Sequence, residues 1–389
     1  MTTVETPAGL RRIGWDAALV GMAVSALMQT YLATVTPTLV AELANPDAYG
    51  WVNGAYLVAS VTLLVLSAAI TDRVGPRRTY VAGMGLYVTG TVLVSVSPSM
   101  AGLLAGRVVQ GCGAGILVPA ALSVVAMVSS DAVRGRAFGV MGLVQVLANV
   151  VGPVLGGWFA AGPGWRWGVA ATIPLALIGL TLAALHIPRG GPIPQRWWVL
   201  HRHDMFPVAA ARLVTVPLAM AFLAGGLVLS VVTFAPWSLA ALHGASAQQT
   251  GLLLVPLFVG SAVGSVLGSR LVSKPWGLSV AWLFAAAGVL VGLPNRPWAI
   301  SAGAAVVALG CSMVLPIVLT TVQSRAPESQ MAATSSLVQV ARHAGSALLV
   351  PALGIWTTSA TAPLRGGFGL LTCLFVTALG GLILTRRTR

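Results

Sequence analysis

Three ionisable side chains lie inside long apolar runs of this 389-residue sequence: Arg107, Arg342 and His343. A charge inside a hydrocarbon layer is costly unless it is paired or hydrated, so we interpret Arg107 as functional. The alternative is a structural charge bound to helix-end carbonyls. Histidine ordinarily titrates near pH 6.5, so His343, beside Arg342, is our preferred proton carrier. A hydrogen-bonded structural histidine fits the sequence equally well.

Acidic residues are scarce, because the chain has only eight of them and none lies in the middle of an apolar run. Proton coupling needs a titratable group in the membrane, so Asp16 and Glu42, at the two ends of the first run, are the other candidates. A binding cavity poor in acids suits a neutral, anionic or mainly apolar compound better than a polycation.

The elements that position these groups are membrane-spanning helices. Hydrophobic residues make up 57% of the chain and charged residues 8%, with a mean hydropathy of +0.90, far from the composition of a water-soluble domain. Apolar runs of roughly 20 residues recur along the chain, and a helix of that length crosses a bilayer. Twelve spans are predicted, near 15–40, 50–71, 79–97, 100–129, 136–160, 165–186, 212–240, 247–270, 277–293, 298–324, 331–356 and 366–385.

The stretch 187–211 divides these spans into two sets of six. It holds four prolines, three arginines and two histidines, so it reads as a linker. We therefore expect an N-terminal half over 1–186 and a C-terminal half over 212–389.

Basic residues predict the orientation. With the N-terminus in the cytoplasm, 17 of the 22 arginines and lysines fall in cytoplasmic segments, as the positive-inside rule requires. Both termini are thus predicted to be cytoplasmic and the location is the cell membrane. The formal charge of +14 is scattered over short loops, which favours a membrane surface over nucleic acid. The first run is read as a retained helix, and the three cysteines show no metal-ligand spacing, so no metal or cofactor is expected.

The loop after the second predicted span contains an acid, a base, a glycine and a basic pair: Asp72, Arg73, Gly75, Arg77 and Arg78. The glycine permits a tight turn and the arginines suit the cytoplasmic headgroups. This loop resembles the signature loop of the major facilitator superfamily. Short arginine-rich loops are also ordinary topology signals.

Three further segments resemble the drug:proton antiporter branch of that superfamily. They are Gly106–Gly115 around Arg107, the run Gly152-Pro153-Val154-Leu155-Gly156-Gly157, and Ala341–Gly345. In the second segment, glycines allow close backbone approach and Pro153 bends the helix, so it is interpreted as a hinge or seal between halves. Simple packing is the alternative.

The resemblance implies an all-α membrane protein of twelve helices in two six-helix halves. It also implies a secondary active transporter that exports small drug-like or secondary-metabolite compounds by proton antiport. Small molecules, protons and membrane lipid would be its partners, and we expect a monomer. One departure concerns coupling: the family's first helix generally carries an aspartate nine residues before a proline, and counting back from Pro37 reaches Met28.

Two other classes are considered. A facilitator or importer of a small nutrient or metabolite would use the same fold. An enzyme would need a catalytic cluster, a CxxC pair or a phosphate-binding loop, and the sequence has none of these.

The family fold implies a central cavity between the halves. Each single candidate is weak, since a buried polar residue often only bonds a neighbouring helix. The predicted substrate-binding residues are Met28, Gln29, Tyr31, Asn53, Gln110, Gln145, Asn149, Trp237, Gln323 and Gln339.

Overall fold

The computed structural model describes residues 8–128, 131–187, 212–272, 274–294, 296–325 and 331–358. Within these ranges the chain forms eleven α-helices and one short 3₁₀-helix, η1. In chain order they are α1 (Ala8–Glu42), η1 (Pro46–Ala48), α2 (Tyr49–Val74), α3 (Pro76–Ser95), α4 (Met100–Val128), α5 (Asp131–Ala161), α6 (Trp165–His186), α8 (Arg212–His243), α9 (Ala247–Leu271), α10 (Gly277–Gly292), α11 (Pro297–Arg325) and α12 (Met331–Thr358).

The lipid environment accounts for this helical architecture. A backbone that spans a bilayer must pair its N–H and C=O groups internally, and a helix does so within one segment. Among the described residues, eight helices are long and apolar enough to cross a membrane, and α10 is a shorter apolar helix.

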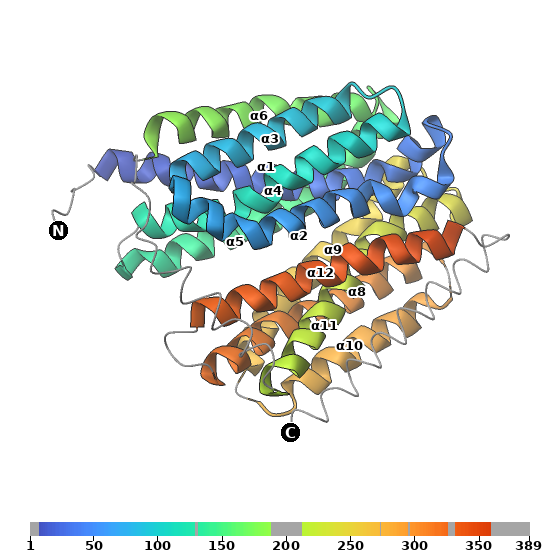
Figure 1. Ribbon diagram of the computed structural model, residues 1–389. Coiled ribbons are helices and arrows are strands. Elements are labelled where there is room, and N and C mark those ends of the chain that lie inside the picture. The colour runs from blue at the N-terminus through green and yellow to red at the C-terminus, as the bar shows by residue number, and fades with distance from the viewer. Residues whose placement is uncertain are drawn as a thin grey trace.

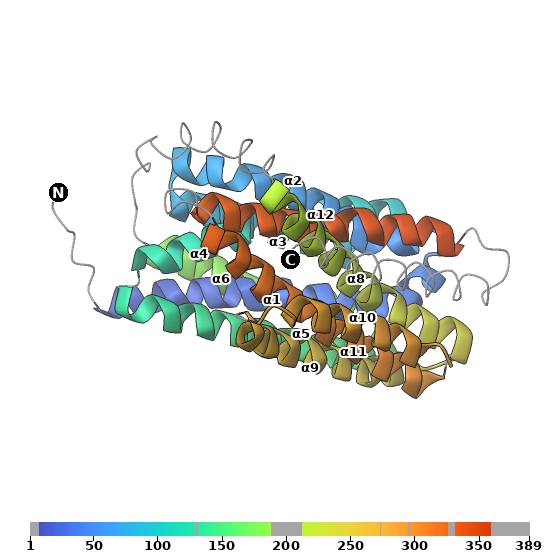
Figure 2. The ribbon, with the colours of Figure 1, turned by 90° about the horizontal axis from the view of Figure 1, so that it is seen from below.

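The helices form two bundles (Figure 1). The N-terminal bundle consists of α1 to α6, which pack mainly through α3 on α4, α2 on α4 and α1 on α5 and α6. The C-terminal bundle consists of α8 to α12, with α11 packed on α9 and α10, and α12 on α8. The largest contacts between the bundles are those of α12 along α2 and of α9 along α5 (Figure 2), and α1 makes a smaller contact with α8.

The predicted spans match these helices closely. The six spans before residue 187 correspond to α1–α6 and the five between 212 and 356 to α8–α12. Two helices start earlier than predicted, α1 at Ala8 and α5 at Asp131. The linker beyond Ile187 and the last predicted span, 366–385, lie outside the described residues.

Small residues set the distance between α2 and α4. A Cβ atom added at Gly111 would overlap the carbonyl oxygen of Tyr56, and one added at Gly115 would overlap that of Ser60. Glycines four residues apart on one helix face let two backbones touch, which is how helices associate in lipid. This contact holds α4, and with it Arg107, against α2.

Candidate functional site

A cavity of about 240 Å³ lies between the two bundles. Seven helices line it: α1, α2 and α5 from the N-terminal bundle, and α8, α9, α11 and α12 from the C-terminal bundle. Its polar and ionisable lining residues are Gln29, Thr30, Gln145, Asn149, Ser261, Ser265, Ser312, Arg342, His343 and Ser346.

Five of the predicted site residues meet in this cavity. Gln29 approaches from α1, Gln145 and Asn149 from α5, and Arg342 and His343 from α12. The arrangement places amide groups of one bundle and a cation of the other around the same space.

The lining hydroxyl groups were not among the predicted site residues. Ser261 and Ser312 bind each other across α9 and α11, with their oxygens 2.7 Å apart. Ser346 donates to the Gly225 carbonyl at 3.0 Å and lies one helical turn after Arg342. The spacing of four residues between Arg342 and Ser346 predicts that both side chains face the same space, because positions i and i+4 share a helix face.

Arg342 and His343 form a contact with defined proton positions. His343 Nδ1 lies 2.8 Å from the carbonyl oxygen of Gln339. A carbonyl only accepts, so Nδ1 carries the proton, and the Nε2 of a neutral ring is then an acceptor. The Nη2 of Arg342 lies 3.4 Å from that Nε2, which makes a long, weak bond. The Nε of Arg342 is buried and has no hydrogen-bond partner within the described part of the chain.

Arg107 lies outside the cavity lining and is fully buried. Its Nε donates to the Val52 carbonyl at 2.8 Å, its Nη1 to the side-chain oxygen of Gln110, and its Nη2 to that of Asn53 at 3.4 Å. The guanidinium also lies over the Tyr56 ring, 4.2 Å from its centroid. These neutral partners satisfy the cation without a carboxylate.

The hydrogen bonds around Arg107 extend to the other bundle. Asn53 Nδ2 lies 3.4 Å from Thr233 Oγ1 on α8, and the Tyr49 hydroxyl donates to the Thr233 carbonyl at 2.9 Å. Asn53 and Gln110, predicted as substrate contacts, therefore bind Arg107.

The glycines of the Gly152–Gly157 segment face two different helices. A Cβ at Gly152 would overlap Thr30 Oγ1 of α1, and one at Gly156 would lie 3.1 Å from Thr34 Cβ of the same helix. A Cβ at Gly157 would lie 2.7 Å from the Ala247 carbonyl oxygen of α9.

The α9 helix brings its own glycine to this contact. A Cβ at Gly251 would overlap the carbonyl oxygen of Pro153. The start of α9 is fixed by a capping box, in which Ser246 Oγ accepts from Gln249 N and Gln249 Oε1 from Ser246 N. The segment therefore packs within its own bundle on one side and seals against the other bundle on the opposite side.

A second contact of the same kind joins α12 to α2. A Cβ at Gly50 would lie 2.8 Å from Gly354 Cα, and one at Gly54 would lie 2.5 Å from Pro351 Cγ. The α12 helix carries Pro351-Ala352-Leu353-Gly354 here, and α5 carries Pro153-Val154-Leu155-Gly156. The same Pro-x-Leu-Gly pattern therefore lies at both contacts.

Both contacts lie on one side of the cavity, the η1 end. On α5 and α12 the lining residues precede Pro153 and Pro351, whereas on α2 and α9 they follow Gly54 and Gly251. Each of the four helices thus places its close contact toward η1 and its lining residues away from it. The bundles are packed together at the η1 end of the cavity.

The signature-like loop joins α2 to α3 at Gly75, whose φ is +88° and ψ 153°. That conformation is open to glycine almost alone. Arg77 donates to the carbonyl of Ala184 near the end of α6, whereas Arg73 and Arg78 are exposed. The side chain of Asp72 lies outside the described part of the structure.

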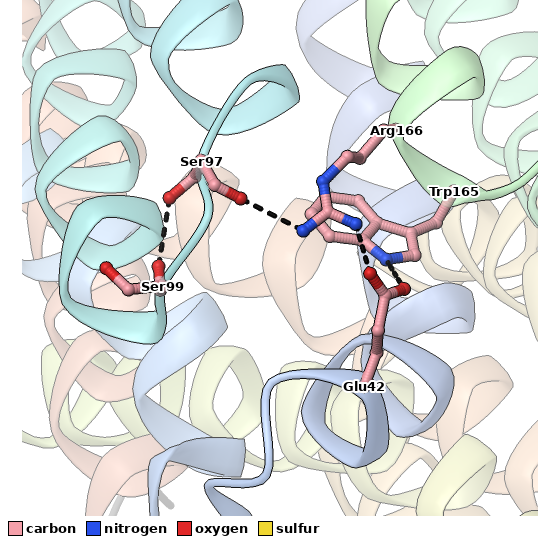
Figure 3. Close-up of polar contacts among 5 residues, drawn as sticks. All are labelled: Glu42, Ser97, Ser99, Trp165 and Arg166. Atoms are coloured by element: carbon pink, nitrogen blue, oxygen red, sulfur yellow. Dashed lines mark hydrogen bonds and ion pairs between the residues drawn. The ribbon is translucent and has the colours of Figure 1, made fainter.

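The two terminal acids of the first predicted span do not line the cavity. Asp16 is exposed. Glu42 pairs with Arg166 and accepts from Trp165 Nε1 at 2.7 Å (Figure 3). Arg166 also donates to the Ser97 carbonyl at 3.0 Å, so Glu42 ties α1 to the start of α6 and to the α3–α4 loop.

The remaining predicted contacts also lie outside the cavity lining. The Tyr31 hydroxyl donates to the Trp165 carbonyl at 2.8 Å, inside the N-terminal bundle, and Met28 is buried there. Trp237, Gln323 and Gln339 are partly buried on C-terminal helices.

Relatives of known sequence point to transport. An uncharacterized MFS-type transporter of Mycobacterium tuberculosis is 36% identical over 193 residues, covering 49% of this chain and 32% of the relative. The multidrug transporter protein MdtP of Bacillus subtilis is 24% identical, covering 86% of this chain and 73% of MdtP. Multidrug resistance protein 3 of B. subtilis is 24% identical, covering 66% of this chain and 60% of that relative. The chain thus spans about a third to three quarters of these relatives.

Solved transporters share the fold. A bacterial homolog of the human lysosomal transporter Spinster superposes with a TM-score of 0.72 at 18% identity, covering 98% of this chain and 96% of that one. The nucleoside transporter NupG superposes with a TM-score of 0.76 at 10% identity, covering 97% of this chain and 98% of NupG. The family model of the Major Facilitator Superfamily matches residues 18–350. The chain is therefore a multi-pass integral membrane protein of the Major Facilitator Superfamily, with that family's fold, and is a transporter and not an enzyme.

Proposed function

We propose that this transporter exports small drug-like or secondary-metabolite compounds across the cell membrane by proton antiport and alternating access. The observation that carries the proposal is the cavity between the bundles, which both bundles line and whose η1 end is closed by paired glycine contacts. Such a site can be exposed to either side when the bundles rock about it.

The predicted orientation supports export. With cytoplasmic termini, the η1 end faces outward, so the contacts of α5 on α9 and α2 on α12 close the outer side. The cavity would then load from the cytoplasm. The names of MdtP and Multidrug resistance protein 3 favour drug-like cargo.

His343 is the favoured coupling group, because it lines the cavity whereas Glu42 is paired at the η1 end and Asp16 is exposed. Protonation of Nε2 would remove the acceptor that Arg342 uses and would set two cations side by side. His343 therefore cannot carry a proton on Nε2 and accept from Arg342 at the same time. Proton binding would free the guanidinium to move.

A facilitator or importer is the second candidate. It is favoured by one observation: none of the described lining residues carries a carboxylate, and position 28 is methionine. A transporter without a carboxylate carrier has one fewer route to proton coupling.

Flux in proteoliposomes tests the choice. Purified protein is reconstituted with an acidic lumen, and uptake of a compound panel is measured with protein-free liposomes as the control. Antiport should concentrate a substrate in the lumen as protons leave, and an uncoupler should abolish this. Equilibration without accumulation would identify a facilitator, and accumulation only with acid outside would identify a proton symporter. Either result would refute the proposed proton antiport.

A further inference from the structure

Arg342 places an uncompensated cation on the cavity wall. Guanidinium has five N–H donors. Among the described residues this one makes a single side-chain bond, the long contact to His343, and its buried Nε has no partner there. No carboxylate is present among the described residues that line the cavity. Glu42, at the end of α1, is already paired with Arg166 at the η1 end.

Such a cation needs a counter-charge. Removing an ion from water is unfavourable, and a buried donor without an acceptor adds to that cost. A bound anion would offset both at once, since carboxylates and related groups accept from two guanidinium N–H groups in parallel. Arg107 shows the contrast, because neutral acceptors from three residues already satisfy it.

We propose that the cavity selects organic monoanions: compounds with one carboxylate or similar acidic group, held by Arg342, and an apolar body. The proposal rests on the proposed function only in taking this cavity as the substrate site. The apolar body would lie against Leu257 and Phe258 of α9 and Val228 of α8, which also line the space. The volume of about 240 Å³ suits one small compound.

Two neighbours position the guanidinium. Neutral His343 accepts from Nη2 and thereby orients Arg342 without adding a negative charge that would compete with the ligand. Gly225 of α8 makes room for the stem, because a Cβ there would lie 2.7 Å from Arg342 Cγ. The cation is therefore held at the wall by packing and one weak bond, and no described residue accepts from its other donors.

The amides of Gln145 and Asn149 line the cavity from the other bundle. An amide N–H can donate to the second oxygen of an acidic group, and an amide oxygen can accept from a polar substituent. An anion bound at Arg342 could thus contact both bundles, which a transported substrate must do to stabilise a closed intermediate.

Binding of three probes of equal shape tests the charge preference. These are 2-naphthoate, neutral 2-naphthamide and cationic 2-naphthylmethylammonium, measured by equilibrium dialysis with the purified full chain. The carboxylate should bind at least about tenfold more tightly than the amide, the ratio that one charge-assisted hydrogen bond supports, and the ammonium should bind most weakly. Arg342→Gln should remove the preference and Arg342→Lys should keep part of it.

Arg270→Gln is the matched control, since it removes the same charge from an exposed position on α9. It should leave all three affinities unchanged. Folding of each variant is checked by its thermal transition, and the wild-type comparison of the three probes stands even if Arg342→Gln does not fold.

The proposal is overturned if folded wild-type protein binds the amide or the ammonium as tightly as the carboxylate, or binds no carboxylate. It is also overturned if Arg342→Gln folds and keeps the preference. Failure of export is a separate outcome, because an importer of organic anions would show the same binding order and the opposite flux.

Discussion

Gly157→Ala should loosen the η1 end of the transporter. The added Cβ would lie 2.7 Å from the Ala247 carbonyl oxygen and 2.8 Å from Gln248 Cα, where ordinary contacts begin at 3.4 Å. The backbones of α5 and α9 must therefore separate by about 0.7 Å to accept it. Overpacking of this kind costs roughly 1–3 kcal/mol, and the cost applies only while the η1 end is closed. The closed population should fall about 5- to 150-fold relative to the open one.

Cysteine labelling reports that shift. Val228 lines the cavity from α8, so a Val228→Cys reporter reacts with a membrane-impermeant maleimide added on the η1 side only when that end opens. The reagent is added to each side of the membrane separately, which makes the readout independent of the predicted topology. The background replaces the native cysteines by alanine at Cys112, Cys311 and Cys373.

The control is another glycine of the same helix. Gly142 is exposed and a Cβ there would meet nothing within 4 Å, so Gly142→Ala has the same effect on helix propensity and none on packing. Its labelling rate should equal that of the parent, whereas Gly157→Ala should label faster from the η1 side. Equal rates in the two variants would show that the α5–α9 contact does not hold the η1 end closed.

Four further outcomes are expected. Arg107→Gln should lower the melting temperature, because each buried acceptor left without its donor costs about 1–3 kcal/mol; an unchanged transition with lost proton-driven flux would instead make Arg107 a coupling residue. Gly75→Ala should slow transport and leave equilibrium binding intact, because its φ of +88° is strained for alanine by about 1–3 kcal/mol; equal losses in both assays would contradict this. His343→Gln should keep binding and exchange but lose accumulation against a gradient, and full uphill transport would refute the histidine carrier. A reporter fused after Arg389 that works only outside the cytoplasm should stay silent, since activity would reverse the topology.

The helices of this protein were predictable because an apolar run of about 20 residues in lipid pairs its backbone N–H and C=O groups within itself by forming a helix. The errors lie at helix ends. Helix α1 begins at Ala8, seven residues before its apolar run, and includes Arg11 and Arg12. The length of an apolar run reports the part of a helix in hydrocarbon, and a helix continues into the headgroups wherever its backbone bonds remain favourable.

The site was less predictable, because the rotation of each helix about its axis is set by packing. Gln145 and Asn149 face the cavity, whereas Asn53 and Gln110 turn toward Arg107. In sequence, all four are amides in apolar runs. A buried guanidinium needs several acceptors, and this requirement determined which amides became unavailable to substrate.

The position of Asn53 links the Arg107 cluster to the closed end. On α2, Asn53 directly precedes Gly54, which packs on α12, and its amide reaches Thr233 of the C-terminal bundle. Parting the bundles at the η1 end would break that bond together with the bond from Tyr49 to the Thr233 carbonyl.

The 2.9 Å bond of Tyr49 contributes about 0.5–1.5 kcal/mol and the 3.4 Å contact of Asn53 adds less, so together they are comparable to the lower end of the cost of one misplaced methyl group in the glycine contact. Opening would also separate Asn53 Nδ2 from Thr233 Oγ1, while Asn53 Oδ1 still accepts from Arg107. Arg107, although it lines no part of the cavity, therefore braces the helix face that must detach for the η1 end to open. A buried charge with neutral partners can in this way influence the conformational balance without touching substrate or carrying a proton.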